Sequence, residues 1–285
     1  MSSISGVLRD FPRARSGAPG DPGLFGPDSV AWKVNGEAAM IVGGGRALLM
    51  QVAHPLVAAG VAQHSQFPRD SFERLWRTLD AMLTISFGDS NQWKEAADRV
   101  THVHEGVRGT SGEGVEYDAL DPELLLWVHA TLVDSALVTY ERLVGLLRAV
   151  EKERYYQEMK RQATVLRVPD EVLPETLEDF HSYMEATIPT LEVSDDALAL
   201  RDGIVSPDVP FILRPVSAWM RALTIEMLPG HIREGFGLRQ STARRATAEM
   251  SSAVLRFLLP LVPRRVRLWP HAKKASKRTA SRALP

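Results

Sequence analysis

PELLLWVHATLVDSALVTYERLVGLL, residues 122–147, is the stretch that decides the fold. Apolar side chains occupy most sides of a helix with this sequence, whereas a surface helix has a single apolar face. Asp121 is a suitable N-cap, and Pro122 suits the first helical position. The stretch therefore predicts a helix buried at the centre of a bundle. His129 falls on one of its inward faces, where a buried histidine usually makes a core hydrogen bond.

The segments around this helix also show helical rather than strand periodicity. Residues 31–41 predict a helix that stops at Gly43–Gly45, where the glycines would allow close backbone approach. Prolines divide the chain after residue 168 into short helices, and no period-two strand or fixed repeat is evident. We expect one all-α domain over residues 30–262. A Pro/Gly-rich irregular leader, 1–29, precedes it, and a basic tail, 263–285, follows it.

The composition excludes several kinds of cofactor. The chain has 285 residues and no cysteine. Disulfides, iron–sulfur clusters, thiolate-ligated haem and cysteine-attached haem are therefore excluded. Any metal would need histidine, carboxylate, tyrosine or methionine ligands.

Charge is distributed unevenly. Residues 263–285 carry eight Lys or Arg and no acid, while residues 1–262 carry 26 basic and 35 acidic side chains. The acidic body gives no broad phosphate-binding face, so we expect no specific nucleic-acid partner. Ends of this kind are usually solvated and mobile, and the alternative is peripheral membrane contact through the tail, with Leu268 and Trp269 touching anionic lipid.

Nothing in the sequence predicts export or membrane insertion. The N-terminus, MSSISGVLRDFPRAR, has no apolar core or cleavage pattern of a signal peptide, and no uncharged apolar run reaches about 18 residues. We therefore expect a cytoplasmic protein.

The stretch WKEAADRVTHVHEGVRG, residues 93–109, is the best candidate for a chemical site. We expect a helix from Trp93 to Arg108 and a loop from Gly109 onward. On this helix, Trp93, Ala97, Val100 and His104 share one inward face, Arg108 follows His104 by one turn, and His102 points elsewhere. The residues alone leave two interpretations of His104 open: a core histidine with one partner, or a ligand held for a metal.

Two other stretches place polar side chains near apolar helices. In RALLMQVAHP, residues 46–55, Pro55 predicts that the helix kinks or restarts, with His54 beside it. His54 would either line a pocket or cap the helix end. In the helix after Pro68, Arg74, Arg77 and Thr78 share one face and form a strip rich in hydrogen-bond donors. Such a strip is usually solvated.

Five segments together resemble a known family. They are RALLMQVAHP (46–55), RLWRT (74–78), HVHEGVRG (102–109), YDALDPELLLWVHAT (117–131) and LPGHIREGFGL (228–238). In this order they resemble the MpaB-type oxygenases, whose rubber-cleaving members are the latex clearing proteins. The resemblance spans roughly residues 30–265.

The resemblance implies a globin-like all-α fold around a non-covalent haem b. It implies His104 as the iron ligand with Arg108 as its neighbour, and Arg74, Arg77 and Thr78 on the distal side. The rubber-cleaving branch has a lysine where this chain has Arg77, and a histidine where it has Gly109. Rubber as the substrate therefore does not follow.

The leading expectation is a haem-dependent oxygenase that uses dioxygen on an apolar small molecule, with isoprenoids and other alkene-containing compounds as candidates. His54 and His129 are secondary candidates for the pocket around the cofactor. One alternative is a non-haem metalloenzyme using His54, His104 and His129 with a carboxylate such as Glu73. The other is a non-catalytic helical lipid-binding protein.

Overall fold

The computed structural model describes residues 13–65, 71–207 and 209–281, and the side chains in these ranges except those of 71–75. The first half of the fold contains α2 (Val30–Asn35), η1 (Ala38–Val42), α3 (Gly43–Val52), α4 (Pro55–His64), α5 (Ser71–Phe87), α6 (Ser90–Glu105), β1 (Arg108–Thr110), β2 (Glu116–Asp118), α7 (Pro122–Leu143) and α8 (Ala149–Val165). The second half contains η2 (Asp170–Val172), α9 (Leu177–Thr187), η3 (Ile188–Thr190), α10 (Asp195–Val205), η4 (Phe211–Leu213), α11 (Arg214–Met227), α12 (Gly230–Gly235), α13 (Thr242–Leu258), η5 (Leu259–Leu261), α14 (Arg264–Arg267) and α15 (Pro270–Ala280).

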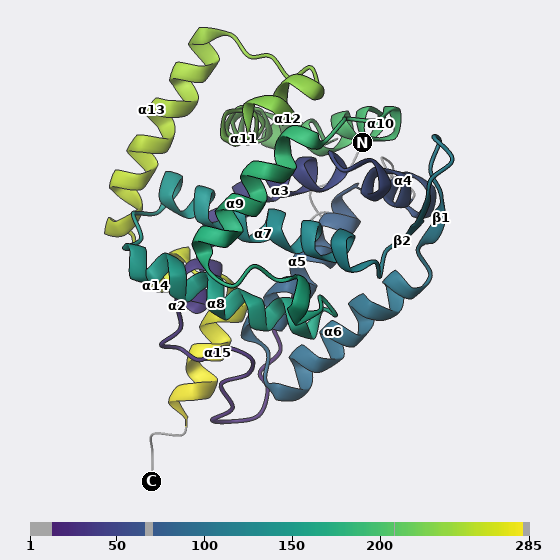
Figure 1. The fold of residues 1–285 in the computed structure, drawn as a ribbon. Helices are drawn as coiled ribbons and strands as arrows, with labels where there is room; N and C mark the ends of the chain where they lie inside the picture. The colour runs from purple at the N-terminus through teal and green to yellow at the C-terminus, as the bar shows by residue number, and fades with distance from the viewer. Residues whose placement is uncertain (1–12, 66–70, 208, 282–285) are drawn as a thin grey trace.

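Helix α7 is the central element, as its sequence predicts. It runs through the middle of the molecule in Figure 1, and α2, α3, α8 and α13 pack against it. Of its 22 residues, 13 are buried, so it is enclosed on most sides. Asp121 caps its first turn by accepting from the backbone N–H groups of Glu123 and Leu124. The Trp127 indole donates to the carbonyl oxygen of Met50 over 3.1 Å and ties α7 to α3.

The glycine triplet begins α3 and does not stop a helix, so this prediction was wrong. The expected close backbone approach is present. A Cβ atom on Gly43 would lie 2.3 Å from Oγ1 of Thr139 on α7, and one on Gly45 would lie 2.8 Å from Oγ1 of Thr224 on α11. Helix α3 therefore uses its first turn to pack against two neighbours at once.

Arg46, one residue after the glycines, joins the same three helices. Its buried guanidinium lies 2.6 Å from the carboxylate of Asp134 and donates to Ser135 Oγ and to the carbonyl oxygen of Met227, each over 2.7 Å. These bonds satisfy a charge that would otherwise be costly to bury.

The predicted kink at Pro55 is a full break between α3 and α4. Pro55 occupies the first turn of α4, and His54 is its N-cap residue, with an extended backbone (φ −78°, ψ 121°). Among the described residues, no single helix has the length and apolar character of a membrane span. The segments 38–52 and 55–64 have this length and apolar character only when they are taken together, and the chain bends by 106° between them.

A short β-hairpin follows α6. Strands β1 and β2 pair antiparallel, with Gly109 opposite Tyr117. The helix predicted to continue to Arg108 ends instead at Glu105, and the loop expected from Gly109 onward contains this hairpin. Tyr117 is buried against Ala59 and Leu124, so the hairpin is attached to the body through α4 and α7.

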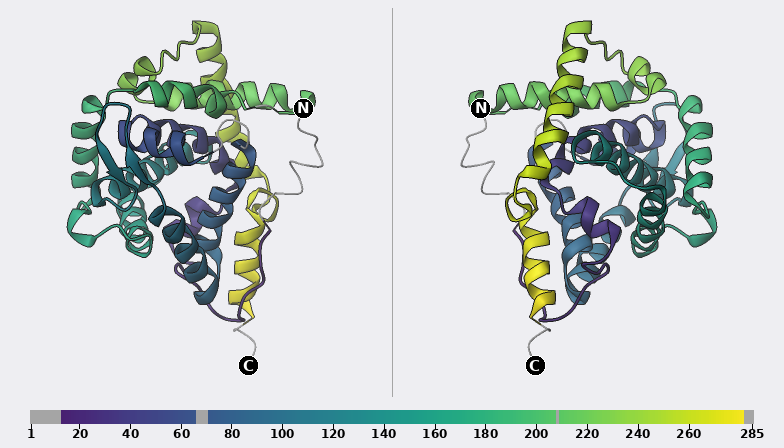
Figure 2. Two further views of the ribbon diagram at one scale, coloured as in Figure 1. Left: turned by 90° about the vertical axis from the view of Figure 1, so that its right-hand side faces the viewer. Right: turned by 90° about the vertical axis from the view of Figure 1, so that its left-hand side faces the viewer.

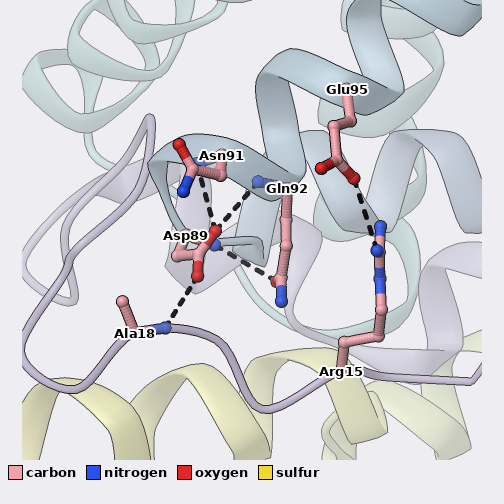
Figure 3. A network of polar contacts seen from close by, with 6 residues as sticks. All are labelled: Arg15, Ala18, Asp89, Asn91, Gln92 and Glu95. Carbon is pink, nitrogen blue, oxygen red and sulfur yellow. Dashed lines mark hydrogen bonds and ion pairs between the residues drawn. The ribbon is translucent and has the colours of Figure 1, made fainter.

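The leader is packed at the turn between α5 and α6. Figure 3 shows that Asp89 caps α6 and also accepts from the backbone N–H of Ala18 in the leader, over 2.7 Å. In the same view Arg15 lies 3.4 Å from Glu95. The leader is therefore irregular, as expected, but the described part of it is fixed to the helices.

The basic C-terminal segment also folds onto the body, in contrast to the solvated, mobile end expected from its charge. Helix α15 runs along the leader and packs against α5 (Figure 2). Trp269 and Ala275 are buried, and Arg278 donates to the carbonyl oxygens of Asp21 and Gly88. Burial of small and aromatic residues between the charged positions explains how so basic a segment can pack.

Candidate functional site

His104 lies in the last turn of α6, on the face predicted from its spacing. The less exposed positions of α6 include Trp93, Ala97, Val100 and His104, while the side chain of His102 is 86% exposed. The imidazole of His104 is half-buried. A capping box at Asp89 and Gln92 fixes the other end of the helix. Helix α6 thus presents one inward histidine and one outward histidine.

Helix α4 and the hairpin fix the chain immediately after His104. Ring Nε2 of His64 lies 3.0 Å from the carbonyl oxygen of Arg108, and the Gln63 amide donates to the carbonyl oxygen of Thr110 over 2.9 Å. The hydroxyl group of Tyr117 donates to Gln63 Oε1 over 2.8 Å. Three side chains therefore hold the segment that follows His104.

The same contacts explain the glycine at position 109. A Cβ atom there would lie 2.7 Å from the hydroxyl oxygen of Tyr117 and 2.9 Å from Oε1 of Gln63. A larger residue such as histidine would displace the hydrogen-bonded side chains of Gln63 and Tyr117. Their position therefore requires a glycine at 109.

The side chain of Arg108, the first residue of β1, pairs with the other strand of the hairpin. Its guanidinium lies 2.9 Å from the carboxylate of Asp118, and both side chains are substantially exposed. The prediction that Arg108 lies one helical turn beyond His104 was wrong, because Gly106 ends α6 and Arg108 begins β1.

The predicted distal strip lies on α5, which packs against α6 in an antiparallel pair joined by the turn at Gly88. The beginning of α5 and the end of α6 are therefore at the same end of the pair, where Arg77 and Thr78 are both exposed. The backbone of Arg74 lies in α5, but its side chain and that of Glu73 lie outside the described residues.

His54 and Arg108 share a cleft of about 660 Å³ between α4, the hairpin and the start of α7. Nδ1 of His54 is buried, and no residue in the described part of the chain forms a hydrogen bond with it. Burial lowers the pKa of His54, and the nearby carboxylates of Asp121 and Glu123 oppose this shift.

The carboxylates in this cleft were missed by the sequence reasoning. Glu116, Asp118, Asp121 and Glu123 all line it. The only signal was their density in the segment 116–123, which we interpreted as a loop and a helix cap.

His129 is separate from this cleft and lies in the core. Its side chain is buried, and neither ring nitrogen has a hydrogen-bond partner among the described residues. Burial lowers its pKa to about 4, while the backbone of Met159, near the ring but without hydrogen-bond geometry, raises it slightly. The expected core hydrogen bond is absent, so the imidazole is held neutral by desolvation.

The three inward histidines do not converge. Within the described part of the chain, which includes His54, His104 and His129, no group of three or more histidine or carboxylate residues is arranged to hold a metal ion. This argues against the non-haem metal centre considered from the sequence. A haem, in contrast, needs only one protein ligand to its iron.

Comparisons with known proteins agree with this architecture. Residues 32–263 match the model of a family described as "ER-bound oxygenase mpaB/B'/Rubber oxygenase, catalytic domain". The chain belongs to this oxygenase family. The match begins within α2 and ends just after η5. It includes every predicted site residue and leaves the described leader, α14 and α15 outside.

Relatives of this oxygenase-family chain include uncharacterized proteins of Mycobacterium bovis and Mycobacterium tuberculosis. Each is 29% identical over 227 residues, which cover 76% of this chain and 88% of the relative. Among solved structures, a latex clearing protein in its closed state matches with a TM-score of 0.58 and 19% identity, covering 85% of this chain and 70% of that protein. This structural match confirms the fold class.

Proposed function

We propose that this chain is a haem b-dependent oxygenase that uses dioxygen on an apolar small molecule, with His104 as the iron ligand. The observation that carries the proposal is the half-buried imidazole of His104 at the end of α6, in a chain whose residues 32–263 match an oxygenase family. Isoprenoids and other alkene-containing compounds are the substrate class we favour. When bound, haem supplies the redox chemistry that activates dioxygen.

The described residues fit a haem in two respects. Helix α6 directs one imidazole, that of His104, inward, and the segment after it is held by His64 and Gln63, which supports a fixed ligand orientation. Apolar side chains also remain only partly buried on the neighbouring elements: Val57 and Val61 on α4, Leu79 and Met82 on α5, and Val107 after α6. Such surfaces suit a flat apolar macrocycle and an apolar substrate.

We assign the distal roles to α5. Arg74 and Arg77 would orient dioxygen or the propionate groups, and Thr78 would donate a hydrogen bond. Guanidinium groups stay protonated and only donate, so they suit an anionic oxygen species but would not ligate the iron. Preorganised donors of this kind stabilise developing negative charge.

Arg108, His54 and His129 have supporting roles in this proposal. Arg108 would hold the hairpin through Asp118 and so fix the chain beside His104. His54 would line the cleft that it shares with Arg108. His129, buried in the core, would act only through the position of α7.

Dioxygen uptake tests the proposal. The purified full-length protein is supplied with squalene, oleic acid or a short polyisoprene, with and without ascorbate as reductant, and with squalane as a saturated control. We expect uptake with at least one alkene and none with squalane. His104→Ala should lower the rate by about 100-fold or more, whereas His102→Ala, at the exposed histidine of the same helix, should leave it unchanged.

Two results would contradict the proposal. One is uptake that does not differ between the wild-type protein and His104→Ala. The other is tight alkene binding without uptake and without any effect of His104→Ala, which would identify a lipid carrier.

A further inference from the structure

Helix α13 turns its large apolar side chains away from the molecule. Its inward side has Ala248 and Ser252, both 1% exposed, and the partly buried Leu255. On the opposite face, Met250 is 65% exposed, Val254 51% and Phe257 76%. The spacing of four and three residues aligns these three side chains along the helix. An ordinary surface helix has the reverse arrangement.

Further large apolar side chains are exposed on elements next to α13 or on those that pack against it. Leu261 in η5 is 72% exposed and Val266 in α14 is 65% exposed. Phe211 and Ile212, just before α11, are 78% and 69% exposed, and α11 packs against α13 through a bond from Trp219 to Ser251. Helix α13 lies at the outer edge of the molecule in Figures 1 and 2. So many large apolar side chains on adjacent elements indicate an interaction surface.

The charge around this surface is positive, although the body of the protein is acidic. Residues 239–267 contain seven arginines and one acidic residue, Glu249. Arg245 is paired with Glu226 and Glu249, and Arg267 is paired with Glu37, which leaves the other arginines to set the charge of the surface. Arg256, Arg264 and Arg265 are exposed. An apolar helix face flanked by arginines is the pattern of a helix that lies in the interface of an anionic membrane.

We propose that the α13 face, defined by Met250, Val254, Phe257, Leu261 and Val266 with the flanking arginines, docks onto an anionic lipid surface. A second copy of this chain fits less well, because an isologous dimer brings the same arginine-rich patch of both copies together. Lipid phosphates supply the opposite charge, and the acyl boundary accepts the apolar side chains.

This assignment differs from the lipid contact considered for the basic tail, because it uses Arg264, Arg265 and Val266 at the start of that segment and not Leu268 or Trp269. Trp269 is 4% exposed, and Leu268 packs against the core, so neither presents its side chain to lipid. Docking of this face requires neither the cofactor nor the oxygenase activity.

Vesicle flotation with the full-length protein tests the proposal. The vesicles contain phosphatidylcholine alone or with a quarter phosphatidylglycerol. We expect flotation only with the anionic vesicles, weakened by 0.5 M NaCl. Val254→Gln/Phe257→Gln should weaken partitioning about tenfold or more, because both apolar side chains are lost from the interface. Arg264→Gln/Arg265→Gln should weaken it roughly tenfold.

The matched control is Val103→Gln/Val115→Gln, which removes two exposed valines, 65% and 49% exposed, from α6 and the hairpin. This variant should float like the wild-type protein. Circular dichroism and size-exclusion chromatography with light scattering establish folding and oligomeric state for each variant. The proposal is overturned if anionic vesicles bind no protein, if Val254→Gln/Phe257→Gln binds as the wild-type protein does, or if these two residues hold a dimer that does not bind vesicles.

Discussion

His129 shows what the structure adds at the scale of a single residue. The helical pattern placed it inside the protein, and it is buried there. The pattern could not show that both ring nitrogens lack partners among the described residues, because the surroundings of the ring come from segments distant in sequence, such as Met159 of α8. An imidazole in this position should be neutral in the folded state, and its pKa is lowered to about 4.

This shift predicts a pH dependence of stability. The unfolded chain takes up a proton on His129 near pH 6.5, whereas the folded chain takes it up only near pH 4. Stability should therefore fall as the pH falls through this window, by about 2 kcal/mol between pH 7 and pH 5 from this group. Urea unfolding at both pH values should show that His129→Leu loses about this much pH dependence.

The exposed His102 provides the control for this prediction. His102→Leu should keep the pH dependence of the wild-type protein, because its side chain is 86% exposed. Equal pH dependence of wild type, His102→Leu and His129→Leu would show that His129 is not held neutral by burial.

At the scale of elements, the sequence predicted helices well and their ends less well. The central helix, the Asp121 cap, the break at Pro55 and the inward face of α6 were all predicted, because apolar spacing and proline stereochemistry act locally. The end of α6 was misplaced by three residues. Gly106 was not recognised as a helix end, and the pairing of β1 with β2 that places Arg108 on the hairpin is not encoded in either strand alone.

The glycine triplet was misinterpreted for a related reason. Glycine ends many helices, but Gly43 begins α3 because Thr139 of α7 lies where its side chain would be. This contact joins segments almost 100 residues apart, and no local pattern reveals it.

Adjacent glycines give a matched test of this packing. Gly43→Ala would place Cβ 2.3 Å from Thr139 Oγ1, while a Cβ atom on Gly44 would meet nothing within 4 Å. We expect Gly43→Ala to destabilise the fold by about 1–3 kcal/mol through overpacking. Gly44→Ala should be neutral or stabilise it by up to about 1 kcal/mol through helix propensity. Thermal or denaturant unfolding measures both, and equal effects would contradict the close contact of α3 with α7.

At the scale of the whole molecule, the segments before and after the family domain meet at one place. Asp89 binds the leader, and Arg278 of α15 donates to Asp21 of the leader and to Gly88 of the turn between α5 and α6. Composition suggested an irregular leader and a solvated tail, because a charge pattern cannot show which arginine will be buried. The two ends instead fix the turn that joins the helices of the proposed site.

Substitutions of the neighbouring residues Arg278 and Lys277 should therefore change the stability of the protein to different extents. Arg278 is 5% exposed, while Lys277 beside it is exposed. Arg278→Met should destabilise the protein by about 2–4 kcal/mol, since it removes charge-assisted bonds to buried carbonyl groups. Lys277→Met should change stability by less than about 0.5 kcal/mol. Similar melting temperatures for the two variants would show that α15 is not held by Arg278.

The most direct measurement of the central claim is the visible absorption spectrum of the freshly purified full-length protein, compared with His104→Ala and His102→Ala. If His104 ligates haem iron, we expect an intense band near the violet end of the spectrum, from haem bound in a ratio of about one per chain. The band should be lost or strongly altered in His104→Ala and retained in His102→Ala. A protein without this band after reconstitution with haem, or a spectrum that His104→Ala leaves unchanged, would contradict the account.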